Sequence, residues 1–209
     1  MKKIFIPLLV LLGVTLYPND LSTQKILSIK KETIIHIVPL GNIDKKYPEL
    51  VKTYIEDFYG FECVIDSTQP LTKDILASSG TRYEASKIIT KFNSDKNTLL
   101  LTDVDIAIFD KEKNIKEYGI IGLGFRPGKT CVVSTFRIRR HVSEKKMLDR
   151  LQKVSIHEVG HNLGLDHCDY DKKCMMNDVR GTIKQIDMEE VWFCHKCRKK
   201  IGMKNIPNL

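Results

Sequence analysis

The stretch that decides the fold is HEVGHNLGLDHC, residues 157–168. Its first five residues place His157 and His161 four positions apart. On a helix, two such residues lie on one face, one turn apart, so both imidazoles can reach a single cation. Glu158 follows the first histidine and would project near that cation without binding it. There a carboxylate can take a proton from metal-bound water.

The second half of the stretch completes the predicted site. Gly164 has no Cβ and can adopt a positive φ, so it can end the helix and turn the chain sharply. After that turn, His167 can supply a third nitrogen. Three histidines leave one position of a tetrahedral Zn²⁺ open to water, as a hydrolytic site requires. The alternative is a core helix with hydrogen-bonded histidines, but it would need five specified positions within eleven residues to coincide.

A second group of metal-binding residue types follows at once. Cys168 and Cys174 are followed by the pair Cys194 and Cys197, which has C-x-x-C spacing. Two thiolate pairs separated by a loop indicate a structural zinc site with four cysteine ligands. The alternative in an exported protein is two disulfides. Zinc is favoured because C-x-x-C pairs make strained disulfides but good chelates.

The remaining cysteines, Cys63 and Cys131, each stand alone in an apolar segment far in sequence from the other four. We expect them to be buried free thiols and not zinc ligands. A disulfide between them would require that their two strands lie close together.

Extended and helical segments alternate along the rest of the chain. Apolar spacing predicts helices over 47–59, 82–92 and 142–163, the last with Ser143 as a candidate N-cap. Short runs rich in β-branched and aliphatic residues predict strands over 33–38, 61–65, 99–102, 118–125 and 131–138. This alternation predicts an α/β fold built on a mixed, mostly parallel sheet. Gly122 and Gly124 favour a bulge or a close backbone approach over a nucleotide-binding loop.

The motif resembles the signature of the metzincin metalloproteases, specifically the archaemetzincins. The resemblance continues through Cys174-Met175-Met176 and the seventeen residues 177–193, to Cys194 and Cys197. The spacer between Cys168 and Cys174 has five residues, where the family usually has four. The strong match covers residues 157–197.

This resemblance implies a role for each residue that matches the family pattern. His157, His161 and His167 would bind a catalytic zinc, with Glu158 as general base and acid. Met176 would be the Met-turn residue beneath the ligands, Gly164 would end the helix, and Cys168, Cys174, Cys194 and Cys197 would bind a second, structural zinc. The implied fold is a twisted five-stranded sheet with one antiparallel edge strand beside the cleft, and by position 131–138 is the candidate edge strand.

Composition and charge limit the class of protein. The chain has 209 residues with a net charge of +8 and 42% hydrophobic residues, an ordinary globular composition. No apolar run is long enough for a protein with several membrane spans. Lys2 and Lys3 before the apolar run 4–16 predict a signal peptide over residues 1–19, or an uncleaved membrane anchor. We therefore expect a secreted or periplasmic protein with one domain, residues 20–209, that includes a structural zinc segment at 168–197.

The function expected from these residues is zinc-dependent hydrolysis of peptide bonds, with two zinc ions and a peptide or protein as substrate. The alternative is a non-catalytic zinc module that binds a peptide or a partner, but a purely structural site has no need of Glu158. The lysines and arginines around the cysteines offset the charge of four thiolates, so they do not indicate a nucleic-acid partner. We expect a monomer, with membrane contact only through an uncleaved N-terminal segment. The sequence leaves the choice between endopeptidase and aminopeptidase open.

Overall fold

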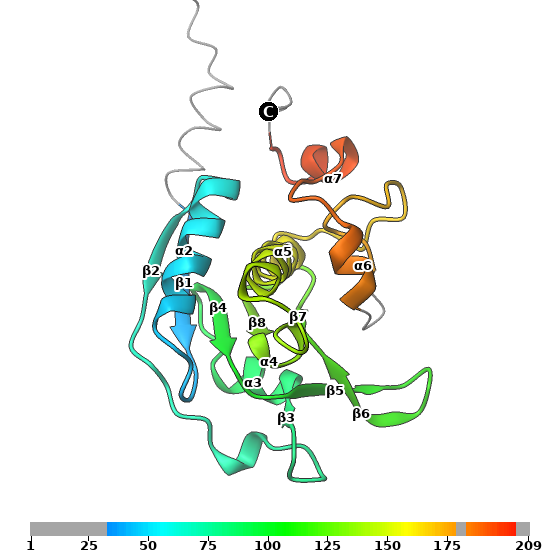
Figure 1. Cartoon of the computed structure of the whole chain (residues 1–209). Helices are drawn as coiled ribbons and strands as arrows, with labels where there is room; N and C mark the ends of the chain where they lie inside the picture. Colours follow the sequence, from blue (N-terminus) through cyan, green and yellow to red (C-terminus); the bar gives the residue numbers. More distant parts are fainter. Residues whose placement is uncertain (1–32, 179–182, 204–209) are drawn as a thin grey trace, which may run out of the picture.

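In the computed structural model, the alternating segments fold into a mixed sheet with helices on both faces (Figure 1). The structure describes residues 33–178 and 183–203. The main sheet has the strand order β2-β1-β4-β8-β7. Its strands are β1 (Ile34–Pro39), β2 (Glu62–Ile65), β4 (Asn97–Thr102), β7 (Gly122–Gly124) and β8 (Thr130–Ser134). All neighbouring pairs are parallel except β7 and β8. The predicted five-stranded, mostly parallel sheet is confirmed.

Successive side chains of a strand point to opposite faces of the sheet, and each face packs into its own hydrophobic core. Leu99 and Leu101 of β4 face the core that also contains α2 (Lys46–Tyr59) and α5 (Glu144–Asn162). Leu100 faces the opposite core, with α3 (Ala85–Lys91). All three leucines are fully buried, and each such side chain stabilises the fold by about 2 kcal/mol. Helix α5 therefore packs against one face of the sheet, and α2 packs beside α5 (Figure 1).

Helix α5 begins where the sequence predicts. The Ser143 side chain accepts a hydrogen bond from the Lys146 backbone N–H at 3.3 Å, which satisfies one of the free donors of the first turn. The hydroxyl of Tyr59 in α2 donates to the carbonyl oxygen of Ile156 at 2.8 Å. Because this contact is fully buried, it fixes α2 against the turn of α5 that precedes the histidines.

Two of the predicted strands are wrong in extent. The segment 118–125 is divided between β6 (Ile115–Ile120), which belongs to a second sheet, and β7. The segment 131–138 is a strand only as far as Ser134, whose side chain accepts a hydrogen bond from the Phe136 N–H at 3.1 Å and caps the short helix α4 (Thr135–Ile138). A serine at an N-cap competes with continued extension of the strand. The antiparallel edge strand is therefore β7, and β8 lies inside the sheet between β4 and β7.

The second sheet was not predicted. It has the order β3-β5-β6 and contains β3 (Tyr83–Glu84) and β5 (Ile106–Asp110) beside β6. The predicted helix over 82–92 begins only at Ala85, because Tyr83 and Glu84 pair with β5. A short 3-10 helix, η1 (Lys73–Ile75), lies in the preceding connection. The antiparallel β5–β6 pair projects beyond the main sheet (Figure 1).

Cys63 and Cys131 are buried free thiols, as expected. Cys63 lies on β2 and Cys131 on β8, with β1 and β4 between them. Three strand-to-strand steps of about 4.8 Å separate their backbones by roughly 14 Å. A disulfide needs Cα atoms closer than about 7 Å, so the fold excludes this bridge.

The residues of the predicted signal peptide, 1–19, lie outside the described part of the structure. Within residues 33–178 and 183–203, none of the helices combines the length and the apolar character that crossing a bilayer needs.

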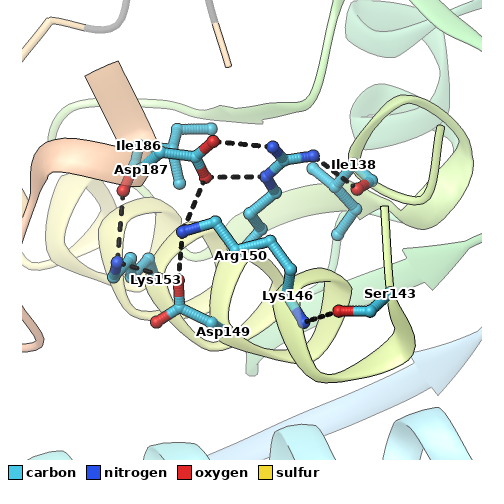
Figure 2. Close-up of polar contacts among 8 residues, drawn as sticks. All are labelled: Ile138, Ser143, Lys146, Asp149, Arg150, Lys153, Ile186 and Asp187. Carbon is cyan, nitrogen blue, oxygen red and sulfur yellow. Dashed lines mark hydrogen bonds and ion pairs between the residues drawn. The ribbon is translucent and has the colours of Figure 1, made fainter. Parts of the chain in front are cut away.

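Helix α6 (Ile183–Met188) is fixed to α5 by a partly buried charge network (Figure 2). The Arg150 guanidinium donates to both carboxylate oxygens of Asp187, at 2.8 and 2.7 Å, and to the carbonyl oxygen of Ile138 at 3.0 Å. Lys153 donates to the carbonyl oxygen of Ile186 at 3.2 Å and to Asp149 at 3.0 Å. A forked, charge-assisted pair of this kind fixes orientation as well as distance.

We predict that Asp187→Asn lowers the free energy of unfolding at neutral pH by about 2 kcal/mol, because the buried Arg150 side chain loses its carboxylate partner. Hydrogen bonds from Arg150 lower the pKa of Asp187 to about 2, whereas an unfolded aspartate titrates near 3.9. The stabilisation is therefore complete above about pH 5 and is lost as the pH falls towards 2.

Urea denaturation of zinc-loaded wild type and variant between pH 7 and pH 3 measures this difference. Glu190→Gln is the control, since Glu190 pairs with Lys173 on the surface, and its loss should cost less than about 1 kcal/mol. An equal effect of the two substitutions at pH 7 would contradict the prediction.

Candidate metal centre and active-site cleft

The three predicted histidines meet at one point. His157 and His161 lie on the last turns of α5, and His167 lies beyond the turn that follows. Each offers a ring nitrogen, and these atoms lie within 4.8 Å of one another. The ring centroids are 4.6 Å apart for His157 and His161, and 4.8 Å apart for His161 and His167. The sequence therefore placed this cluster correctly.

The turn that returns His167 to the helix requires glycine. Gly164 has φ +94°, a conformation that L side chains rarely adopt. Its N–H donates to the carbonyl oxygen of His161 at 2.8 Å, and the N–H of Leu165 donates to Gly160 at 3.0 Å. These bonds satisfy carbonyl groups at the end of α5 while the chain reverses.

Backbone carbonyls orient the two helical histidines. The Nδ1–H of His161 donates to the carbonyl oxygen of Leu165 at 2.8 Å, and that of His157 donates to Met175. Because a carbonyl only accepts, each bond fixes the tautomer with Nε2 as a free lone pair. Burial lowers the pKa of His157 to about 3 and that of His161 to about 4. Both imidazoles are thus neutral, the form that binds metal.

Glu158 lies in the same cleft but outside the group of nitrogen donors. It is 6% exposed, and burial raises its pKa to about 8. Two glycines of β7 make room for it. A Cβ at Gly122 would lie 2.4 Å from a Glu158 carboxylate oxygen, and one at Gly124 would lie 2.8 Å from the Glu158 carbonyl oxygen. The predicted close backbone approach is confirmed, and its partner is the helix that carries the motif.

A third glycine, Gly160 in α5, makes room for Met176. A Cβ at Gly160 would lie 2.7 Å from Sδ of Met176. Met176 is fully buried, and its carbonyl oxygen accepts the N–H of Cys168 at 2.6 Å. The glycine inside the motif therefore lets the Met176 side chain pack directly against α5.

The four predicted cysteines form a second cluster, and their sulfur atoms lie within 4.8 Å of one another. Sγ of Cys168 is 3.6 Å from that of Cys194, and Sγ of Cys174 is 3.9 Å from that of Cys197. A tetrahedron with Zn–S bonds of about 2.3 Å has edges of about 3.8 Å, whereas a disulfide needs about 2.05 Å. The geometry fits zinc and not two disulfides.

Hydrogen bonds within this cluster already favour a thiolate. The hydrogen bond between the Cys174 and Cys197 thiols, together with the N–H of Cys194 that donates to Sγ of Cys174 at 3.3 Å, lowers the pKa of Cys174 to about 5. Cys194 is also the N-cap of α7 (His195–Lys200), so the cluster joins that short helix to the turn after α5.

The cleft is a cavity of ≈ 600 Å³ beside the histidines. It is lined by the three histidines, by Glu158 and by the glycines of β7. It is also lined by residues of α5 and α6 and by the residue that follows α6: Lys153, Val154, Ile186 and Glu189. Sequence reasoning missed this second group, because α5 and α6 come together through contacts between residues far apart in the chain, such as Arg150 with Asp187 and Lys153 with Ile186.

These features define a zinc metallopeptidase, a hydrolase of peptides or proteins. They are the order of the sheet, the buried helix with two histidines, and the third histidine beyond a glycine turn. Comparison with known proteins identifies the family. The chain belongs to peptidase family M54, which matches residues 77–203, and the resemblance to the archaemetzincins is confirmed.

Two curated relatives illustrate the match. Archaemetzincin of Natronomonas pharaonis is 29% identical over 178 residues, which cover 80% of this chain and 98% of the relative. Archaemetzincin of Saccharolobus solfataricus is 27% identical, and the match covers 81% of this chain and 93% of the relative.

Two crystal structures share the fold. Archaemetzincin of Archaeoglobus fulgidus, complexed with malonate, has a TM-score of 0.70 at 24% identity and covers 80% of this chain and 99% of its own. Archaemetzincin of Methanopyrus kandleri has a TM-score of 0.67 at 21% identity, and the match covers 81% of this chain and 93% of that structure's chain.

The comparisons correct one prediction, the signal peptide. The archaemetzincins of Natronomonas pharaonis and Halobacterium salinarum match over 98% of their own length with 80% of this chain, and this leaves the export segment without support. Export of the protein stays a prediction.

We predict that Gly122→Ala lowers peptide hydrolysis at least tenfold while zinc stays bound, because the new methyl group enters the space of the Glu158 carboxylate. Metal analysis and kcat/KM on one peptide measure the two effects. The control is Gly119→Ala, another strand glycine, whose Cβ would come closest to the guanidinium of Arg137, at the far end of a flexible side chain. Equal losses of activity in the two variants would contradict this explanation.

Proposed function

We propose that this metallopeptidase cleaves peptide bonds with Glu158 as general base and general acid. The observation that supports it is a buried carboxylate inside the cleft, one residue from His157, that does not belong to the group of nitrogen donors. A site that only stored metal or stabilised the fold would gain nothing from a carboxylate held there at the cost of desolvation.

His157, His161 and His167 would hold the catalytic zinc. When bound, zinc supplies a Lewis acid that polarises a carbonyl group and lowers the pKa of water. Glu158 would take the proton from the attacking water and deliver it to the amine that leaves. Burial raises the pKa of Glu158 to about 8, and a nearby dication would lower it, so the carboxyl can both accept and return a proton near neutral pH.

The peptide would bind in extended form along β7. Within residues 33–178 and 183–203, this strand is the last of the main sheet and pairs there with β8, so its other edge, beside the cleft, presents N–H and C=O groups that no strand of this part of the chain pairs with. An added strand would pair with these groups, which gives affinity without sequence selectivity. The proposed peptide-binding edge is therefore β7, and not the segment 131–138 expected from the sequence.

Cys168, Cys174, Cys194 and Cys197 would hold a second, structural zinc. All four positions would be filled by protein, as in sites that only stabilise a fold. The segment 168–197 would thus act as a zinc-stabilised part of a single domain and keep Met176 under α5. Two zinc ions per chain and a monomer follow as further parts of the proposal.

We predict that Glu158→Ala keeps both zinc ions and the fold but lowers kcat/KM by 10²- to 10⁴-fold, roughly the contribution of a positioned acid–base group. Turnover of a peptide mixture, metal analysis and the thermal midpoint measure this. The proposal fails if the variant keeps activity within about tenfold, or if zinc-loaded wild type binds peptides but cleaves none.

We predict that zinc-replete wild type contains two zinc ions and that Cys174→Ser loses one of them together with much of its stability. Cys63→Ser is the matched control, since Cys63 is a buried cysteine on β2, outside the cluster of four. Metal analysis of the purified proteins decides. A stoichiometry of one in the wild type, or loss of zinc in Cys63→Ser, would contradict the assignment.

A further inference from the structure

The cleft is lined by a second buried carboxylate, which the catalytic proposal does not use. Glu189 directly follows α6, and its N–H continues the helical pattern by donating to the carbonyl oxygen of Gln185 at 3.2 Å. Its residue is 5% exposed, yet it lines the same cavity as the histidines. Burial raises its pKa to about 8.

Within the described residues, no cation lies at ion-pair distance from Glu189. Among these residues, its side chain accepts one hydrogen bond, from the amide of Gln185 at 3.5 Å. The three cations that line the cavity each have another carboxylate. Lys153 is 3.0 Å from Asp149, Arg126 is 3.2 Å from Asp166, and Lys113 is 3.5 Å from Asp110.

The position of Glu189 relative to the metal centre follows from the two helices. Lys153 precedes His157 by four residues on α5, so the two lie on one face, one helical turn or about 6 Å apart along the axis. The Lys153 ammonium donates to the carbonyl oxygen of Ile186, three residues before Glu189. The Arg150–Asp187 pair fixes this stretch in place (Figure 2). Glu189 thus belongs to a wall of the cleft that begins about one helical turn from the first histidine.

A buried carboxylate without a cation is costly, and a positive group that enters the cavity removes that cost. Hydrogen-bonding groups at the end of a pocket select ligands strongly, because a ligand that lacks the matching group leaves them unpaired. We propose that Glu189 determines substrate specificity by binding a cationic nitrogen of the peptide close to the scissile bond. This proposal rests on the proposed peptidase function and names its substrate class.

Two sources can supply such a nitrogen: the side chain of a lysine or arginine within the peptide, or the free α-amine at its N-terminus. Acetylation separates them. If the side chain binds, acetylated and free peptides are cleaved alike, next to Lys or Arg. If the α-amine binds, acetylation abolishes cleavage close to the N-terminus, and the enzyme acts as an aminopeptidase.

The test begins with zinc-loaded, full-length protein and a diverse peptide mixture, in free and acetylated forms, with cleavage sites read by mass spectrometry. Matched peptides with Lys, Arg, Gln, Leu or Glu at the selected position then give kcat/KM. Glu189→Gln keeps the shape of the side chain and removes its charge. We expect kcat/KM for the cationic peptides to fall at least about thirty-fold, and for the Leu and Gln peptides to change less than about threefold.

Glu190→Gln is the matched control. It makes the same change one residue later, at a surface carboxylate that pairs with Lys173 and does not line the cavity. It should leave the preference for cationic peptides unchanged. Zinc content and thermal midpoint, measured for both variants, separate a loss of specificity from a loss of structure.

Three results would overturn the inference: no preference for a cationic nitrogen in the wild type, an equal loss on cationic and neutral peptides in Glu189→Gln, or a preference for acidic peptides, which would make Lys153 the selecting group. If neutral peptides are still cleaved in a chelator-sensitive, Glu158-dependent way, the peptidase function stands while this inference fails. If no peptide is cleaved, the peptidase function fails instead. Anisotropy with the labelled Lys and Leu peptides on zinc-loaded Glu158→Ala, with and without Glu189→Gln, then still measures the selectivity of the pocket.

Discussion

The hydrogen bond from Nδ1 of His157 to the carbonyl oxygen of Met175 joins the two halves of the site. It presents the other ring nitrogen of His157 to the point where three histidines meet. Met175 in turn lies between Cys174, a member of the thiol cluster, and Met176, which packs beneath Gly160. A partner that orients a metal-binding histidine is nearly as important as the histidine itself. Through this bond the cysteine cluster controls the geometry of the histidine cluster, although the two share no residue.

The rest of the architecture makes such a bond achievable. His157, Glu158 and His161 are all more than 90% buried, and burying polar groups is unfavourable unless partners are supplied. The turn after α5 provides the partners for both histidines, through the carbonyl groups of Leu165 and Met175. In the described part of the chain, the Glu158 carboxylate has no such partner, and it lines the cleft. The motif therefore places its unsatisfied group at the position where chemistry would use it.

The two walls of the cleft are held by different forces. On one side, β7 approaches α5 because Gly122 and Gly124 have no side chains to keep it away. On the other side, α6 is attached by the forked Arg150–Asp187 pair, in which the Arg150 side chain is 6% exposed. Short-range packing defines the wall next to Glu158, and a charge pair holds the wall to which Glu189 belongs. A peptide in the cleft would therefore meet a rigid strand edge on one side and a polar wall on the other.

The sequence by itself determined the histidine cluster, the cysteine cluster, the N-cap at Ser143 and the parallel α/β sheet. These features follow from spacing within one helix or one loop, or from a local repeat of apolar residues, and both are fixed by backbone geometry. Only the tertiary structure decided that β6 and β7, although consecutive in the chain, belong to different sheets, and that β7 is the edge strand of the main sheet. It also decided that Glu189 reaches the cleft. Each of these depends on contacts between residues far apart in the chain, such as Arg150 with Asp187. No local pattern encodes such contacts, because their energy appears only when the whole core is packed.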